Sequence, residues 1–451
     1  MKLLTASNAP DARLGVLERT GFMAGNIGNM LVNTVVSAFL MYFYTDVMMM
    51  NAAVIGTILL ASRIFDGITD LIMGAIVDRT HSKHGRARVW ILRMCIPYAI
   101  SGILLMCVPA EASATAQYIY VAITYNLCNA FCMTALFVPY NAMTVNLTSD
   151  SYEHGILGLF MMFGAVIGGL LVNSTITSAT AALGGDRRAW LIVVSIYAVI
   201  GAALNLICFF STKERCTEYS EEKKKVDTRQ ELKSLFSNKY WILFVTAAFF
   251  MMFLNNFTNT AGVYYAKGVY GDPDYNAGFA NALAIAQLPA MLLAVIPMKK
   301  FGKRNTFLFG VAFILAGMLV QGVTVGNAAV LTVCNAVKGF GAGFASAVVY
   351  GMAADTLSYG ERITGMKAEG IGMGALVFVT KLTSGLANVT VGWILDATHY
   401  DPLAAIQSKS AIGGLNLCYI WIPFAAILAS ALLLCFYDLD KINAAEEKQP
   451  S

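Results

Sequence analysis

The sequence predicts an all-α polytopic membrane protein with twelve transmembrane helices in two six-helix halves. The chain has 451 residues, of which 57% are hydrophobic and only 13% charged, whereas an average soluble domain carries about 25% charged residues. The apolar residues also fall into about twelve blocks of roughly 20, the length that crosses a bilayer core of ~30 Å as a helix. One long polar connection separates the sixth block from the seventh. Together these observations exclude a soluble globular protein.

The expected spans follow one another with short connections, except at that polar segment. STKERCTEYSEEKKKVDTRQELKSLFSNK is dense in lysine and glutamate and is typical of a loop or a surface helix. It divides the chain into an N-terminal half (1–211), a linker (212–238) and a C-terminal half (239–451). The twelve spans are expected to centre near Val32, Ile64, Ile100, Ala130, Val166, Ala198, Phe250, Ala286, Ala312, Phe340, Thr383 and Ile427.

The distribution of lysine and arginine predicts the orientation. If both termini lie on one side, that side collects the basic residues of the 79–88 turn, of the linker and of the 299–304 turn. The opposite connections hold little beyond Arg187, Arg188, Lys267 and Lys409. By the positive-inside rule we expect both termini in the cytoplasm and the protein in the plasma (cytoplasmic) membrane. The N-terminal stretch lacks the apolar region of a signal peptide, so the first span is expected to remain uncleaved.

Two classes of function find no support in the sequence. The nine cysteines and four histidines form no metal-ligand spacing, so we expect no cofactor and no metal site beyond a coupling ion. No nucleophile elbow or phosphate-binding glycine loop is present, which argues against a membrane-embedded enzyme. The net charge of +4 is confined to particular loops and does not indicate nucleic-acid binding. The expected partners are a small solute, a coupling cation and the lipid bilayer, and we expect a monomer.

The second span carries three charges that need an explanation. Arg63, Asp66 and Asp70 lie within apolar sequence, where one charged side chain costs roughly 2.5–3.5 kcal/mol. The two aspartates are four residues apart and therefore share a helix face. Two such carboxylates do not both stay ionised in low dielectric without compensation. Either one of them holds a proton, or a cation or an arginine neutralises their charge. A structural Arg63–Asp66 ion pair does not account for Asp70, so we favour a site for Na⁺ or H⁺.

Other polar residues within the spans fit a solute cavity. Lys381 of the eleventh span is expected to face the interior, because a charge facing lipid is costly. Lys338, near the start of the tenth span, could instead lie near the membrane surface. The fourth span is rich in asparagine and threonine around Pro139, including Asn126, Thr134 and Asn141, and the seventh contains Asn256. Interhelical hydrogen bonds are the plainer explanation for any one of these, whereas the clusters favour cavity-lining helices and a hydroxyl-rich ligand.

Two halves of six spans are the layout of the major facilitator fold, in which substrates bind between the halves near the middle of the membrane. A weak internal echo agrees with this layout. The second-to-third connection contains DRTHSKHGR, and the eighth-to-ninth contains KKFGKRN. Both are basic turns at corresponding positions of the two halves.

Several of these segments together resemble a known family. AAVIGTILLASRIFDGITDLIMGAIVDRTHSKHGRARVW, LMYFYTDV, and GFGAGFASAVVYGMAADTLSYGERITGMKAEGIGMGALVFVTKLTSGLA are similar to the signatures of the glycoside–pentoside–hexuronide:cation symporters. The resemblance covers nearly the whole chain in the same order. It implies a cation-coupled importer of a sugar or glycoside-like solute that works by alternating access.

The resemblance also implies roles for individual residues. Asp66 and Asp70 match the family's two cation-site aspartates, and Thr134 matches a cation-site hydroxyl. Thr69 stands where a member has asparagine, which leaves the choice between Na⁺ and H⁺ open. Lys381 matches a lysine that faces the sugar and cation sites. Residues expected to gate the cytoplasmic side are Asp78, Arg79, Arg86, Asp355, Glu361 and Arg362.

The solute-binding positions depart from the family pattern. Galactoside-binding members carry aspartates where this chain has Met30 and Phe137, a tryptophan where it has Asn141, and an arginine where it has Met161. A pocket that exchanges charge for methionine and phenylalanine cannot bind a galactoside in the same way. We therefore expect a different ligand, either a glycoside with an apolar aglycone or an amphipathic, lipid-like or steroid-like molecule. The expected solute-binding residues are Lys381, Met30, Asn33, Phe137, Asn141, Asn126 and Asn256.

Overall fold

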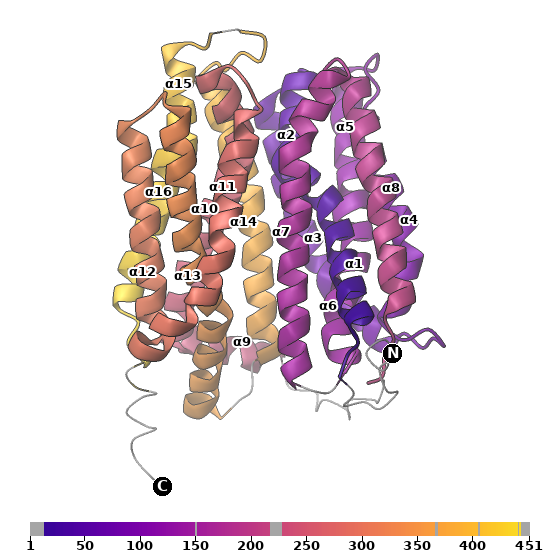
Figure 1. The fold of residues 1–451 in the computed structure, drawn as a ribbon, viewed down its shortest axis with the longest axis vertical. Coiled ribbons are helices and arrows are strands. Elements are labelled where there is room, and N and C mark those ends of the chain that lie inside the picture. Colours follow the sequence, from indigo (N-terminus) through magenta and orange to yellow (C-terminus); the bar gives the residue numbers. More distant parts are fainter. Residues whose placement is uncertain are drawn as a thin grey trace. The chain divides into compact units, whose positions relative to one another are not determined.

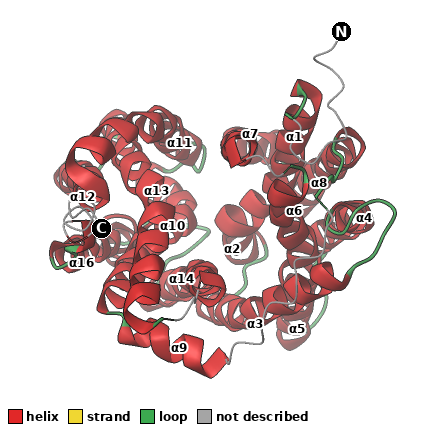
Figure 2. Ribbon diagram, turned by 90° about the horizontal axis from the view of Figure 1, so that it is seen from below, coloured by secondary structure: helices red, strands yellow, loops and turns green. Residues whose placement is uncertain are grey.

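The computed structural model describes residues 13–148, 151–216, 228–365, 369–404, 406–440 and 442. Its chain forms two compact units, Met1–Ser220 and Glu221–Ser451. Within each unit the long helices run side by side (Figures 1 and 2), and the part of the chain that the structure describes contains no strand. This arrangement confirms the predicted all-α class.

The first unit is built from helices that correspond to the first six expected spans. Four of its spans are single helices, and the first and fourth are interrupted by turns of π-helix. In chain order the segments are α1 (Val16–Thr34), η1 (Val35–Phe39), α2 (Leu40–Tyr42), η2 (Phe43–Val47), α3 (Ala52–Arg79), α4 (Arg88–Leu104), α5 (Ala114–Asn126), η3 (Leu127–Met133), α6 (Thr134–Asn146), α7 (Ser151–Ala182) and α8 (Arg187–Ser211).

The second unit begins with a short helix in the predicted linker and then repeats the long-helix pattern. Its segments are α9 (Thr228–Ser237), α10 (Lys239–Tyr270), α11 (Tyr275–Leu293), α12 (Val295–Val323), α13 (Ala328–Thr364), α14 (Glu369–Ala397), α15 (Lys409–Asn416), η4 (Leu417–Trp421) and α16 (Ile422–Cys435). Gly302 interrupts α12 with φ 84° and ψ 171°, so that helix bends at the predicted KKFGKRN turn.

Most of the expected spans have the length and composition to cross a membrane. Over the described residues, 11 helices or runs of helical segments do so. The remaining expected span, the third, is α4, which has only 17 residues and includes Arg88 and Arg93. A bilayer core needs about 20 apolar residues per helix, so the number twelve stays a prediction at this one position.

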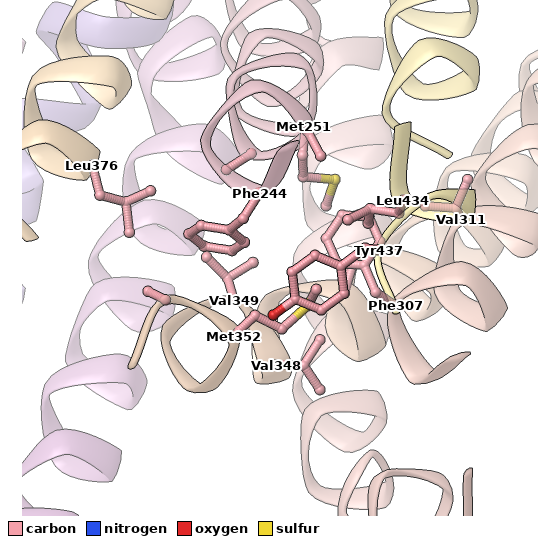
Figure 3. Close-up of a cluster of buried hydrophobic side chains, with 14 of the residues drawn as sticks. Phe244, Met251, Phe307, Val311, Val348, Val349, Met352, Leu376, Leu434 and Tyr437 are labelled. Carbon is pink, nitrogen blue, oxygen red and sulfur yellow. The ribbon is translucent and has the colours of Figure 1, made fainter. Parts of the chain in front are cut away.

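Close packing inside each unit depends on small residues and on one large apolar cluster. In the first unit α1 packs against α7 and α8, and a Cβ placed on Gly28 would lie 2.6 Å from the Gly201 carbonyl oxygen of α8. In the second unit Phe244, Phe307 and Met352 bring α10, α12 and α13 together in the cluster shown in Figure 3. Small residues let membrane helices approach closely where no hydrophobic effect drives them together.

The turn before α4 is held by a carboxylate from the end of the same unit. Gly85 has φ +99°, a left-handed conformation that glycine adopts without strain. The Glu214 carboxylate, which follows α8, accepts the backbone N–H groups of Arg86 at 2.8 Å, Ala87 at 3.0 Å and Arg88 at 2.5 Å. An acid at a helix N-terminus satisfies free N–H groups and opposes the helix dipole.

The second unit repeats this device in the turn at Gly302. That glycine has φ +84°, and the Asp440 carboxylate, which follows α16, accepts the Arg304 N–H at 2.8 Å. An arginine of each turn also bonds to the end of the last long helix of its unit. Arg88 donates to the Phe209 carbonyl oxygen, and Arg304 donates to the Cys435 carbonyl oxygen. The two basic turns are therefore structurally equivalent, and the sequence echo reflects a repeated architecture.

Candidate functional site

The charged residues of the second span lie together in the first unit. Asn51 starts α3 by accepting the Val54 N–H at 3.0 Å, and the regular helix then places Arg63, Asp66 and Asp70 along one side, one turn apart. Arg63 and Asp66 are buried and Asp70 is partly buried. The helix thus carries three ionisable groups in a membrane-spanning segment.

Thr134 of the fourth span meets both aspartates. Its hydroxyl Oγ1 lies 3.0 Å from Asp66 Oδ1 and 2.8 Å from Asp70 Oδ1. The residue is the first of α6 and follows the π-helix η3, and its hydroxyl also lies 3.4 Å from the carbonyl oxygen of Asn129, five residues earlier. π-Helical turns are rare and occur frequently at functional sites. Here the π-helix directly precedes the residue that joins α6 to α3.

Two carboxylates compete for one hydroxyl hydrogen in this triad. A threonine hydroxyl has a single hydrogen and can donate it to one acceptor at a time. Both O···O separations are hydrogen-bond distances, so a proton on a carboxyl group or a cation shared by the three oxygens would strengthen the second contact. The arrangement therefore provides a place for H⁺ or for a small hard cation.

Arg63 compensates part of the negative charge. Its guanidinium Nη1 lies 3.6 Å from Asp66 Oδ2, and the group stands 5.7 Å from the centroid of the Tyr125 ring. The ion pair that the sequence offered as an alternative is therefore present. It coexists with the bridging hydroxyl, because Arg63 faces Asp66 Oδ2 and Thr134 faces Asp66 Oδ1.

The remaining cation and solute candidates of the first unit are spread over four helices. Thr69 donates its hydroxyl to the Asp66 backbone carbonyl at 2.9 Å, and the Asn126 amide donates to Ser62 at 2.9 Å, next to Arg63. Met30 and Asn33 are partly buried on α1, where the Asn33 amide lies 3.6 Å from the Met30 sulfur. Phe137 and Asn141 follow Thr134 on α6, and Asn141 is exposed.

In the second unit the candidates lie on α10 and α14. Lys381 is partly buried on α14. Two residues farther along, the buried Thr383 accepts a hydrogen bond from the Asn256 amide at 3.1 Å. Thr260 and Asn388 make a second link between these helices at 3.1 Å. Asn256 and Thr260 of the seventh span therefore form hydrogen bonds with α14, the helix that carries Lys381.

The expected gating residues occupy the ends of the helices. Arg86 belongs to the Glu214 turn, Arg79 ends α3 and is exposed, and Glu361 and Arg362 lie in the last turn of α13. Asp355 pairs with Lys303, whose Nζ lies 2.8 and 2.7 Å from its two carboxylate oxygens. Asp78 falls in α3, but its side chain lies outside the described residues.

Sequence reasoning did not single out some of the partners. Lys303 was noticed as part of a basic turn, but its acidic partner stands 52 residues away. Neither Glu214, which lies at the beginning of the linker, nor Tyr125 of the fourth span was singled out from the sequence. Glu214 is distinguished by accepting three backbone N–H groups, and Tyr125 by its ring lying near Arg63. Neither contact leaves a local signal in the sequence.

Comparisons with known proteins agree with the sequence signatures. The family described as "MFS/sugar transport protein" matches residues 21–441. The chain is 30% identical over 432 residues to the isoprimeverose transporter of Lactiplantibacillus pentosus, covering 94% of this chain and 89% of that protein. It is 26% identical over 430 residues to the putative glycoside/cation symporter YagG of Escherichia coli (strain K12), covering 95% and 93%.

Solved structures share the fold at low sequence identity. A bacterial homologue of the human lysosomal transporter Spinster, in an inward-facing conformation, matches with a TM-score of 0.68 and 13% identity, over 96% of this chain and 98% of that one. A D-xylose-proton symporter matches with a TM-score of 0.62 and 17% identity, over 94% and 96%. The family match extends over nearly the whole described chain, and the protein therefore belongs to the MFS/sugar transport family of membrane transporters.

Proposed function

We propose that this protein is a cation-coupled symporter that uses H⁺ or Na⁺ to import a sugar or glycoside-like solute by alternating access. The observation that carries the proposal is the single Thr134 hydroxyl within hydrogen-bond distance of both Asp66 and Asp70. A transporter without coupling has no need for two carboxylates around one hydroxyl in a membrane span, where charge is costly.

The proposed mechanism uses the charge of this group as a switch. With no cation bound, Asp66 and Asp70 repel each other, and Arg63 lies beside Asp66. Binding of H⁺ or Na⁺ relieves this repulsion and lowers the penalty for enclosing the two carboxylates in low dielectric. The loaded protein can then close around its solute and reopen on the other side. Because the two carboxylates of the empty site still repel each other, the same step is disfavoured without the cation, which is the condition for coupling.

The solute class is supported by the relatives and by the chemistry of the polar residues. The isoprimeverose transporter and the glycoside/cation symporter are named for sugars or glycosides. Asn126, Asn256 and Lys381 supply donors and acceptors that suit hydroxyl-rich ligands. Met30 and Phe137 are apolar where galactoside-binding members carry aspartate, which favours a glycoside with an apolar part.

Uptake into membrane vesicles tests the coupling. We expect the parent protein to concentrate a labelled glycoside from a panel when an inward Na⁺ or H⁺ gradient is imposed. Asp66→Asn and Asp70→Asn should each abolish uphill accumulation while some solute exchange remains. Asp274→Asn is the matched control, because Asp274 is exposed in a connection of the second unit. If both site variants accumulate solute as the parent does, the coupling site is wrong.

The same panel tests the solute. Accumulation of a glycoside supports the proposed class and identifies its sugar. A response only to steroid-like or detergent-like amphiphiles would instead assign the fold to a different cargo. Comparing Na⁺ and pH gradients in the same vesicles identifies the coupling ion, which Thr69 leaves open.

The proposed orientation places both termini in the cytoplasm, in the plasma membrane, with the monomer as the working unit. The basic turns at 79–88 and 299–304 support it through the positive-inside rule. A C-terminal reporter that is active only in the cytoplasm should be active, and a reporter inserted in the 184–186 turn should not. The opposite pattern would reverse the orientation.

A further inference from the structure

Lys338 is a fully buried charge that the proposed transport site does not use. It lies on α13, in a membrane-spanning segment, with 1% of its surface exposed. Its ammonium Nζ lies 3.2 Å from Asn335 Oδ1 and 3.4 Å from Gln321 Oε1 on α12. The ring of Tyr419 on η4 stands with its centroid 5.1 Å from Nζ. The sequence left open whether Lys338 lies near the membrane surface. In the structure its ammonium does not contact solvent.

No described residue supplies a counter-charge. Within the part of the chain that the structure describes, no carboxylate lies within ion-pair distance of Lys338 Nζ, and its polar contacts are to two neutral amides. A buried ammonium without a compensating charge carries a desolvation cost of several kcal/mol. The other titratable groups nearby, Cys334 and Tyr419, are themselves donors in their neutral forms.

The surroundings also contain more donors than acceptors. Lys338 has three N–H groups, and the two amide oxygens that accept from them lie at 3.2 and 3.4 Å. The Asn335 oxygen is shared, because the Tyr419 hydroxyl also donates to it at 3.3 Å. Gln321 is 1% exposed, and among the described residues its Nε2 has no hydrogen-bond partner. That amide nitrogen is bonded to the same carbon as the oxygen facing Lys338, so a surplus N–H lies beside the ammonium.

We propose that Lys338 and Gln321 form a binding site for a small monovalent anion of the size of chloride, inside the second unit. Such an anion supplies the missing negative charge and accepts both the third ammonium hydrogen and the free amide N–H. The site is fully buried, which selects a small ion that loses its hydration shell at moderate cost over sulfate or phosphate. The aromatic ring of Tyr419 covers one side of the proposed site.

Thermal unfolding of the purified full-length protein in choline chloride and in choline gluconate tests the site. Saturating chloride should raise the Tm of the parent by on the order of 3 °C, because the ligand binds only the folded state. Bromide should act similarly and sulfate should not. Lys338→Met should remove the chloride effect, whereas Lys409→Met, a change at an exposed lysine that starts α15, should keep it.

Gln321→Glu distinguishes an anion site from a lysine needed only for packing. The introduced carboxylate would stand where the amide oxygen now contacts Lys338 and would act as a tethered counter-ion. We expect this variant to unfold at the same temperature in both salts, at or above the Tm of the chloride-bound parent. Equal chloride shifts in the parent and in Lys338→Met, or no halide effect on the parent, would overturn the proposal. Either result leaves the coupling experiment at Asp66 and Asp70 unaffected.

Discussion

The hydroxyl of Thr134 lies 2.8 Å from a carboxylate oxygen of Asp70, a residue 64 positions earlier in the chain. This contact joins α3 to α6, and the same hydroxyl also reaches Asp66. Two carboxylates compete for one hydrogen, and a proton or a cation would relieve this competition. The arrangement links the fold of the first unit to the energy source of transport.

Replacing the Thr134 hydroxyl should weaken cation binding. Thr134→Val keeps the shape and removes the bridging oxygen, and a hydrogen bond to a charged group contributes roughly 1.5–3 kcal/mol. We therefore expect the cation concentration for half-maximal uptake to rise about 10- to 100-fold. Thr134→Ser, which keeps the hydroxyl, should stay within about threefold of the parent. Equal cation dependence of the Val and Ser variants would show that the hydroxyl is not a ligand.

Removing the arginine partner should destabilise the folded protein. Arg63→Gln leaves Asp66 buried beside a neutral group, and breaking one side of a buried pair costs about 3–5 kcal/mol. Asp66→Asn in the same chain should recover much of this loss, because the carboxylate that paired with Arg63 is then also removed. The coupling free energy comes from the double-mutant cycle, measured as unfolding midpoints in denaturant. Additive effects of the two changes would contradict an interaction across the 3.6 Å separation.

The sequence predicted the class of fold and singled out the charged residues of the second span, for physical reasons. Charges in hydrocarbon are costly, so Arg63, Asp66 and Asp70 stand out against their apolar neighbours, and their spacing on a helix fixes their common side. The cation-site role of Thr134 was implied only by the family resemblance, because one hydroxyl among many in a polar span carries no signal of its own. Thr134 directly follows the π-helix η3, and nothing in the residues of that segment distinguishes it from ordinary helix.

Partnerships over long sequence separations were beyond such reasoning. Asp440 and Glu214 were not singled out from the sequence, because their roles depend on turns formed more than a hundred residues earlier. Lys338 looked like a lysine close to a span boundary, yet it is buried by Gln321, Asn335 and Tyr419 from three different segments. Tertiary packing, and not local composition, determines whether such a charge contacts water.

The turn at Gly302 should not accept a side chain. Its φ of +84° disfavours any other residue, at a cost of about 1–2 kcal/mol, and a Cβ there would lie 2.6 Å from Asp440 Oδ2. Gly302→Ala should therefore lower the Tm measurably. Gly278→Ala is the control, because nothing lies within 4 Å of its Cβ position in α11 and alanine favours helix. Similar Tm values for the two variants would contradict a specific role of the turn.

The Lys303–Asp355 pair should matter more for transport than for stability. Both side chains are partly exposed, at 30% and 24%, and such pairs contribute at most about 1 kcal/mol. If the pair belongs to the proposed cytoplasmic gate, Asp355→Asn should slow uptake about tenfold or more, which a stability change of that size does not explain. Exchanging the two charges should restore part of the rate. Asp438→Asn, which alters the nearby Arg304 pair, is the control and should transport as the parent does.

Tyr437 should make the second unit sensitive to alkaline pH. This side chain follows α16, outside the membrane-spanning segments, and is buried among Phe307, Val348 and Met352 (Figure 3). Burial, and secondarily the charges of Asp440 and Asp355, raise the pKa of its phenol well above the ordinary value of 10. A pKa that is raised in the folded state means that folding favours the protonated form. This contribution to stability is complete below pH 10 and is lost as the pH rises above it.

Above pH 10 the parent should therefore lose up to about 1.4 kcal/mol of unfolding free energy per pH unit through this residue. Tyr437→Phe has no phenol to ionise and also removes a buried hydroxyl that has no hydrogen-bond partner among the described residues. We expect its Tm to match or exceed that of the parent at pH 8, and the difference to grow between pH 10 and pH 11. Tyr350→Phe is the control, since Tyr350 is 66% exposed. A pH-independent difference between Tyr437→Phe and the parent would mean that the buried phenol does not contribute to alkaline unfolding.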